Sequence, residues 1–188
     1  MKRLIALSIA ATFSSIAFAA PETYVIEQSH TKPRFEYSHL GFSMQSSRFD
    51  TVTGKITLDR VAHTGSVDVV IDATSVNTGS SVFNGHIQGE DFFATGQFPT
   101  ITYKSDKLIF EGDKPVAVEG NLTIKGITKP VTLTIASVLC MPHPMLKKDA
   151  CGATATAKVK RSDFNIGKYA PYVSDEVTLT IPVESLKQ

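Results

Sequence analysis

The amino-acid sequence predicts an all-β protein. Along many short runs of the chain, apolar residues alternate with polar ones at a period of two, the pattern of a strand with one buried face. Thr and Val are frequent in these runs, as strands prefer, and Gly or Pro stands in the connections between them. A helical period interrupts this pattern in one segment only.

The clearest alternation lies in residues 116–135. One face of its first run holds Val116, Val118, Leu122 and Ile124, and one face of its second run holds Val131, Leu133 and Ile135. Gly126 and Pro130 lie in the connection, which predicts an antiparallel hairpin. The apolar face of this hairpin must cover either packed protein or a cavity.

Strands are expected throughout the rest of the chain. Their predicted ranges are 24–27, 34–39, 48–59, 65–73, 100–110, 116–125, 131–138, 153–161 and 176–183. Eight or nine strands joined by short turns are typical of a closed barrel or of a sandwich, and the alternation alone leaves both open.

One short helix is expected after residue 80. Val82, Phe83, His86 and Ile87 share a helical face, and Thr78 or Ser80 supplies an N-cap. Two glycines weaken this helix by about 1 kcal/mol each, so it must be held by what it packs against. Its apolar residues either plug one end of the β-structure or form a lid over a ligand.

Residues 1–19 are expected to be a signal peptide. Lys2 and Arg3 precede an apolar stretch, and Ala17-Phe18-Ala19 is a small-x-small cleavage signal. The apolar stretch is too short for a membrane span, which needs about 20 residues, so no stable membrane anchor is expected. Cleavage near Ala19 would release residues 20–188 as a single domain into the periplasm.

Composition and motifs exclude several functional classes. The formal net charge is +1 and no basic stripe is present, so nucleic acid is not an expected partner. The sequence contains no Gly-x-Ser-x-Gly, His-Glu-x-x-His, phosphate-binding or dinucleotide-binding motif. We therefore expect neither an enzyme nor a resident cofactor or metal.

The two cysteines, Cys140 and Cys151, are predicted to form a disulfide, because the compartment is oxidising and no other cysteine competes. An alternative is a copper or redox site in the loop from Cys140 to Met145. That loop offers a thiol, the imidazole of His143 and two thioethers, which are ligands that suit copper. The disulfide would consume the thiol.

Several ordered motifs resemble one known family. Besides residues 118–133, they are Ser38-His-Leu-Gly-Phe-Ser, Val70-Ile-Asp-Ala-Thr-Ser-Val-Asn-Thr-Gly, Glu90-Asp-Phe-Phe, Phe98-Pro-Thr-Ile-Thr-Tyr, Arg161-Ser-Asp-Phe-Asn-Ile and Ser174-Asp-Glu-Val. They are similar to the YceI-like family of secreted bacterial lipid-binding proteins. The resemblance implies an eight-stranded antiparallel, lipocalin-like barrel with a short helix capping one end. It also implies a homodimer and a tunnel for an isoprenoid quinone or a polyprenyl lipid.

A barrel of about eight strands is either filled by its side chains or holds one small ligand. If a tunnel is present, aromatic residues are expected at its mouth and wall, namely Phe35, Phe42, Phe83, Phe92, Phe93, Tyr103 and Phe164. Aliphatic residues are expected along it, namely Val69, Ile87, Val118, Leu122, Ile124, Val131, Leu133, Ile135, Val159, Val177, Leu179 and Ile181. Two other functions stay open, a scavenger of assorted hydrophobic molecules including antibiotics and a ligand-free partner of a membrane redox protein.

Overall fold

The structure, a computed structural model, describes residues 20–188, and the expected signal peptide of residues 1–19 lies outside the described residues. The strands are β1 (Glu22–Ile26), β2 (Arg34–His39), β3 (Ser43–Phe49), β4 (Val52–Asp59), β5 (Thr64–Asp72), β6 (Val76–Asn77), β7 (Thr100–Glu111), β8 (Lys114–Ile124), β9 (Ile127–Pro142), β10 (Asp149–Lys160) and β11 (Glu176–Lys187). One helix, α1 (Ser81–Gln88), and two 3-10 turns, Ala73–Ser75 and Arg161–Phe164, complete the described part.

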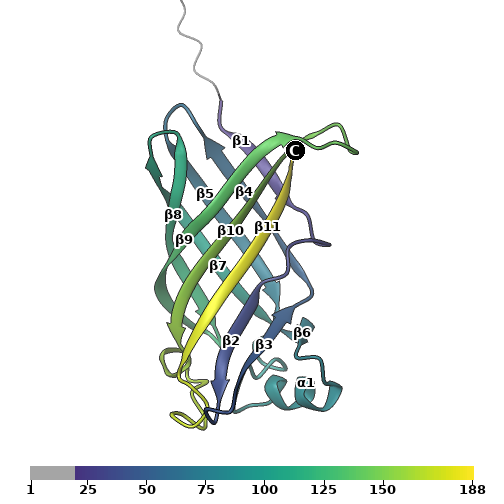
Figure 1. Cartoon of the computed structure of the whole chain (residues 1–188), viewed down its shortest axis with the longest axis vertical. Coiled ribbons are helices and arrows are strands. Elements are labelled where there is room, and N and C mark those ends of the chain that lie inside the picture. Colours follow the sequence, from purple (N-terminus) through teal and green to yellow (C-terminus); the bar gives the residue numbers. More distant parts are fainter. Residues whose placement is uncertain (1–19) are drawn as a thin grey trace, which may run out of the picture.

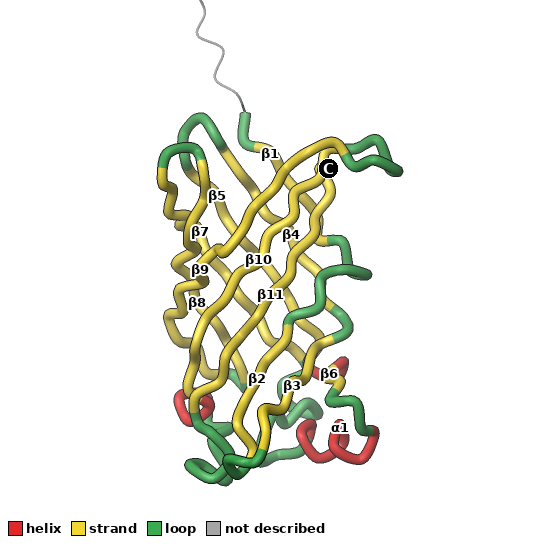
Figure 2. Tube along the Cα trace, in the orientation of Figure 1, coloured by secondary structure: helices red, strands yellow, loops and turns green. Residues whose placement is uncertain are grey.

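Eight of these strands close into an antiparallel barrel (Figure 1). The order around the ring is β1, β4, β5, β7, β8, β9, β10 and β11, and β1 pairs back onto β11 to close it. The prediction of an eight-stranded antiparallel barrel with one short helix is therefore confirmed, and the sandwich is excluded. Figure 2 shows α1 at one end of the barrel, which we call the helix end; the β9–β10 turn lies at the far end.

The remaining strands extend the wall at the helix end. β2 pairs with the first half of β11, where Phe35 lies opposite Leu179, while β1 pairs with the second half, where Tyr24 lies opposite Lys187. β3 pairs with β2, and the two residues of β6 pair with β3. β1 and β2 thus act as two halves of one interrupted strand along β11.

Hydrogen bonds fix the turn that separates β1 from β2. The Glu27 carboxylate accepts the Ser29 hydroxyl, the Ser29 backbone N–H (2.9 Å) and the His30 backbone N–H (3.0 Å). These bonds to the ionised form, led by the one from the Ser29 hydroxyl, lower the pKa of Glu27 to about 2. Thr31 is fully buried and exchanges bonds with the Glu184 backbone, donating at 3.1 Å and accepting at 2.9 Å.

Two expectations about the strands were wrong. The single strand expected at residues 48–59 is two strands, since the backbone N–H groups of Asp50 and Thr51 turn away to bond the carbonyl and hydroxyl oxygens of Ser75. Pro130 lies within β9 rather than in a turn. β10 pairs with β9 only from Thr134 onward. On that side of Pro130 there is no described strand to accept a backbone hydrogen bond, so its missing N–H costs nothing.

The β8–β9 hairpin turn is two residues long. Lys125 and Gly126 both have positive φ, 50° and 74°, and join the paired residues Ile124 and Ile127. Positive φ at both central positions is the turn that matches strand twist, and glycine adopts it without strain. The predicted hairpin is therefore present and Gly126 lies in its turn, but the assignment of Pro130 to that turn was wrong.

Helix α1 begins at Ser81, and Ser80 is its N-cap, with the side-chain oxygen accepting the Phe83 N–H at 3.4 Å. Of its eight residues only Ile87 is fully buried. Ile87 packs onto the aromatic residues that fill this end of the barrel. The helix has no acidic or basic residue other than His86, which becomes relevant below.

Gly120→Ala should destabilise the barrel. A Cβ at residue 120 would lie 2.6 Å from Tyr103 Cζ and 2.7 Å from the Lys104 carbonyl oxygen, so the ring and the backbone would both have to move. Overpacking of this kind costs about 1–3 kcal/mol, which denaturant unfolding should show as a lower free energy of unfolding. Gly152→Ala is the matched control, since its Cβ would meet nothing closer than 3.7 Å. Equal effects of the two changes would contradict the described packing.

Candidate ligand cavity

A cavity of about 360 Å³ runs inside the barrel. It extends from the helix end, where Phe83, Phe92 and Tyr169 line it, to the far end, where Val138, Cys140 and Cys151 line it. The predicted tunnel residues on its wall are Phe35, Val69, Phe83, Ile87, Phe92, Phe93, Tyr103, Val118, Leu122, Ile124, Val131, Leu133, Ile135, Val159, Phe164, Val177, Leu179 and Ile181. Whether each of them touches a ligand stays a prediction.

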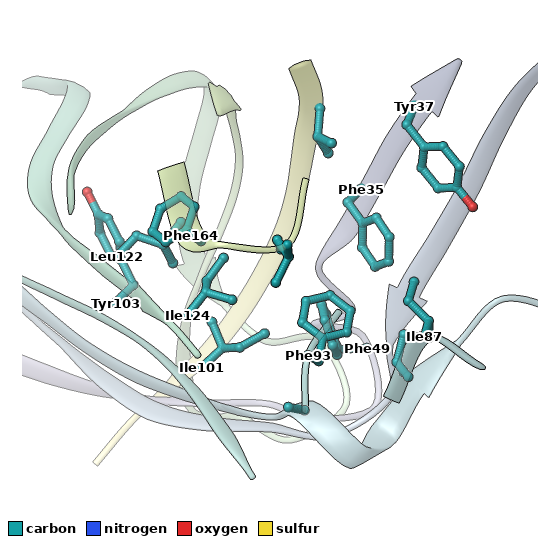
Figure 3. Close-up of a cluster of buried hydrophobic side chains, with 14 of the residues drawn as sticks. Phe35, Tyr37, Phe49, Ile87, Phe93, Ile101, Tyr103, Leu122, Ile124 and Phe164 are labelled. Carbon is teal, nitrogen blue, oxygen red and sulfur yellow. The ribbon is translucent and has the colours of Figure 1, made fainter. Parts of the chain in front are cut away.

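The two ends of the lumen differ in how they are filled. Near α1, the rings of Phe35, Phe49 and Phe93 pack against one another with centroids 5.5–6.1 Å apart, and all three are buried. Figure 3 shows this aromatic cluster beside Ile87. Further along the barrel, inward residues such as Val69 and Val183 are only half-buried. An aliphatic side chain that points inward and is still half-exposed faces a space, so the lumen is hollow there.

Phe42 is the exception among the predicted tunnel residues, and its assignment to the tunnel wall was wrong. It is 87% exposed and does not line the cavity. Leu40 and Gly41 have positive φ (54° and 74°), and the Phe42 N–H bonds the His39 carbonyl at 3.0 Å, so Phe42 belongs to the β2–β3 turn. The alternation of the strand does not continue through that turn, and the side chain faces solvent.

β-Bulges change which residues face the lumen. On β8 the register passes from Ala117 opposite Ile109 to Pro115 opposite Phe110, which leaves Val116 as an extra residue. Pro115 lines the cavity and Val116 does not, contrary to the expected face. On β9 the extra residue is Ala136, and the lining residues pass from odd positions up to Ile135 to even positions from Val138.

The predicted disulfide between Cys140 and Cys151 is present, with an S–S distance of 2.05 Å. The two residues are direct partners across the β9–β10 ladder, and both line the far end of the cavity. The alternative copper site loses its thiolate to this bridge. The Nδ1 atom of His143 is also engaged, since it accepts the backbone N–H groups of Met145 and Leu146, each at 3.2 Å.

Tyr103 crosses from β7 to two neighbouring strands. Its hydroxyl lies 3.0 Å from the Val118 carbonyl oxygen and 2.9 Å from the Val131 carbonyl oxygen and donates to them. The ring covers Gly120, where only a residue without a side chain leaves room. Burial, together with the negative charge of Glu119, raises the pKa of Tyr103 to about 12. The hydroxyl is therefore neutral and directed to the wall, and the ring presents an apolar surface to the lumen.

Arg161 organises the helix end of the cavity and was not predicted from the sequence. Its guanidinium donates to the backbone carbonyls of Ser174 (2.9 Å), Ile166 (2.8 Å), Lys168 (3.3 Å) and Val173 (2.8 Å). Burial lowers the pKa of Arg161, while Asp175 and Tyr37 oppose that effect. One half-buried cation thus holds the loop of residues 165–175 against the cavity.

Comparison with known proteins identifies the chain. The model of the YceI-like domain matches residues 24–185. The chain belongs to the YceI-like family. Protein YceI of Escherichia coli O157:H7 is 33% identical over 190 residues, which cover 100% of this chain and 98% of that protein. UPF0312 protein VVA0736 of Vibrio vulnificus is 32% identical over 192 residues, which cover 100% of both chains.

Solved structures share the fold. The YceI protein of Campylobacter jejuni has a TM-score of 0.69 at 28% identity and covers 80% of this chain and 90% of that one. A polyisoprenoid binding domain from Saccharophagus degradans has a TM-score of 0.65 at 18% identity and covers 88% of this chain and 98% of that one. At that identity the second likeness shows the fold alone.

The YceI-like cavity holds little polar chemistry. Within residues 20–188, every buried side-chain nitrogen or oxygen has a hydrogen-bond partner. The carboxylates of Glu27 and Glu184 meet His30 within 4.8 Å, but these three side chains lie outside the cavity wall. The wall therefore offers mainly apolar contact to an occupant. None of the described helices is long and apolar enough to span a membrane.

Sequence reasoning missed several lining residues of this YceI-like chain. Tyr37 shares a strand face with Phe35, and Ile101 with Tyr103, so period two could have found both. Tyr24 and Ile26 line the cavity from β1, where no tunnel residue was predicted. His39 and His86 line the cavity although both are exposed. The helical period placed His86 on one face with Phe83 and Ile87, but it was not predicted as a tunnel residue. The position of the two histidines at the cavity follows only from how the strand ends and α1 meet.

The Tyr103 hydroxyl should ionise at a higher pH than an ordinary tyrosine does. The pKa of Tyr103 is raised from 10 to about 12, so the folded state binds the hydroxyl proton more tightly than the unfolded state does. The free energy of unfolding therefore has its full value below pH 10 and falls as the pH rises through 12. The difference in tyrosinate absorbance between the wild type and Tyr103→Phe should appear near pH 12. Tyr172→Phe, in an exposed loop, should leave that step in place. A difference that appears near pH 10 would contradict the buried hydroxyl.

Proposed function

We propose that this protein binds or carries a long apolar isoprenoid lipid, an isoprenoid quinone or a polyprenyl chain, in the lumen of its barrel, and that it is not an enzyme. The observation that carries the proposal is the ring of half-buried aliphatic side chains around a cavity of about 360 Å³. Ligand pockets usually measure about 300–1,000 Å³ and are mostly apolar.

The apolar wall of the cavity supports a ligand. The cavity opens at the helix end, so water can enter it, but its wall is almost wholly apolar and offers that water few hydrogen bonds. A hydrocarbon that fills the lumen removes this apolar wall from water and adds van der Waals contacts. The hollow is therefore best explained by a ligand that fills it.

The shape and chemistry of the wall favour a hydrocarbon chain. The cavity reaches from aromatic residues at one end to the disulfide at the other, and branched aliphatic residues line the length between them. Burial contributes about 0.8 kcal/mol per methylene, so a chain of ten or more carbons can bind tightly without polar contacts. The polyisoprenoid binding domain of Saccharophagus degradans, which has the same fold, supports this class of ligand.

A periplasmic location is part of the proposal. The signal-like residues 1–19 support export, and the disulfide suits an oxidising compartment. An apolar lipid cannot diffuse alone through an aqueous compartment, which gives a carrier with an enclosed lumen a physical role there.

The native ligand can be identified directly. Organic extraction of the purified protein followed by mass spectrometry should release an isoprenoid lipid in an amount close to that of the protein. Added isoprenoid quinone should bind to protein whose ligand has been removed. An empty extract from repeated preparations, together with no binding of added quinone, would contradict the proposal.

Leu179→Trp should block the lumen without breaking the wall. Leu179 points into the cavity, and its neighbour Thr178 on the same strand does not line it. The larger ring should reduce the ligand recovered per protein by roughly tenfold, because it occupies space that contributes about 0.8 kcal/mol per buried methylene. Thr178→Trp is the matched control on the outer face and should keep its ligand. Circular dichroism should show the same fold for both variants.

A second candidate is a scavenger of assorted hydrophobic molecules, including antibiotics. The aliphatic wall between the two ends favours it, because such side chains offer no directional contact that would select one apolar chain over another. Competition decides between the two functions. Displacement of quinone by unrelated lipophiles at comparable concentration would favour the scavenger, and resistance to them would favour the isoprenoid carrier.

A further inference from the structure

The cavity reaches the molecular surface at the helix end. Three of its lining residues there, His39, His86 and Tyr169, are exposed. At the far end every described lining residue, including Leu58 and Cys140, is buried or half-buried. The one other exposed lining residue is Arg34, on the side of the barrel where β2 begins. The helix end is therefore the mouth.

The segments around this mouth are almost free of charge. Residues 39–47, 76–89 and 169–174 contain no Asp, Glu, Lys or Arg, although these residues make up 20% of the chain. They form the β2–β3 turn, helix α1 and the loop before β11, which lie together at the helix end (Figures 1 and 2). Lys168 and Asp91 flank the mouth and bond each other.

Apolar side chains project into solvent from the same segments. We call them the mouth rim: Leu40, Phe42, Met44, Val82, Tyr169 and Tyr172. Phe42 and Val82 are 87% and 84% exposed. The β2–β3 turn is joined to the loop before β11, because the Leu40 N–H bonds the Tyr172 carbonyl at 2.9 Å and the Ser174 N–H bonds the Ser38 carbonyl at 3.0 Å. Helix α1 meets that loop through the ring of Phe92, whose centroid lies 5.1 Å from that of His86 and 6.2 Å from that of Tyr169. Tyr169 belongs to both the rim and the cavity wall, so the apolar surface is continuous from outside to inside.

We propose that the mouth rim docks on the surface of a phospholipid bilayer, so that the lipid passes between bilayer and lumen without crossing water. This inference rests on the proposed function. A long hydrocarbon chain that enters water exposes all of its apolar surface, which is a large barrier to transfer. A mouth seated on the bilayer removes that barrier. Tyr and Phe side chains favour the membrane–water interface, and an uncharged rim loses no ionic hydration on contact.

The far end carries a rival surface. There Leu139, Met141, Met145 and Leu146 are exposed on the β9–β10 hairpin beside Lys147 and Lys148. A basic and apolar hairpin would bind anionic lipids and would release them in salt. The mouth rim has no such cations, so its binding should depend neither on anionic lipid nor on ionic strength.

The test is sedimentation of the purified protein with phosphatidylcholine vesicles. The wild type should bind them, with no change between low and high salt. The double variant Phe42→Asp/Val82→Asp should bind at least about tenfold less, since each change removes an exposed apolar group worth more than 1.4 kcal/mol on burial. Met145→Asp is the matched control, because Met145 is 83% exposed at the far end, and it should bind as the wild type does.

Ligand measurements separate this inference from the proposed function. Phe42 and Val82 do not line the cavity, so the double variant should contain as much extracted isoprenoid as the wild type. It should take up isoprenoid quinone from vesicles at least about tenfold more slowly, with unchanged final loading. A wild type that carries isoprenoid but fails to bind vesicles overturns the docking surface alone. A protein that binds vesicles but never isoprenoid overturns the proposed function and the docking role with it.

Two other outcomes would assign the surfaces differently. Loss of vesicle binding in Met145→Asp, or binding that requires anionic lipid and fails in salt, places the membrane contact at the far end and overturns the proposal. Sedimentation velocity tests a second copy of the chain as the occupant. If Phe42→Asp/Val82→Asp converts a dimer to a monomer while vesicle binding is unchanged, the rim is a dimer contact and the proposal is overturned.

Discussion

Closure of the hydrogen-bonded ladder between β1 and β11 is the constraint on which the rest of the structure depends. Once eight strands close, the circumference of the wall is set by the backbone, and side chains can only fill or fail to fill the space inside. At the helix end the rings of Phe35, Phe49 and Phe93 fill it. Beyond them most inward residues are Val, Ile, Leu and Ala, which do not reach across. The hollow persists because a closed ladder cannot collapse onto it.

The seam of the barrel also positions the mouth. β11 is shared between β1 and β2, and the turn that separates those two strands is fixed by the buried Thr31. This lets β2 and β3 continue the wall beyond the ring and carry the uncharged rim. Arg161 holds the facing loop through four backbone carbonyls. A small number of buried polar contacts thus keeps an apolar opening in shape.

Much of the wall could be predicted from the sequence, because period two identifies inward residues wherever a strand is regular. The prediction failed where the period changes. Phe42 follows a turn with positive φ, and Val116 and Ala136 are extra residues in bulges. The strand Ser43–Phe49 was largely missed because its first residues are polar and exposed. Whether the lumen is filled or hollow could not be derived at all, since that depends on closure and on distances between strands remote in sequence.

The bulge at Ala136 has a consequence for the disulfide. Without the extra residue, the alternation of β9 would point Cys140 to the outside of the barrel. The single extra residue therefore places the disulfide on the lumen side. The sulfur atoms then form part of the surface that the far end of an occupant touches. If the proposed ligand fills the lumen, it would shield the bridge on its inner side and favour the intact ladder, so occupancy and resistance to reduction would be thermodynamically linked. Under the proposed function, the rate at which the bridge is reduced would then report whether the barrel is loaded.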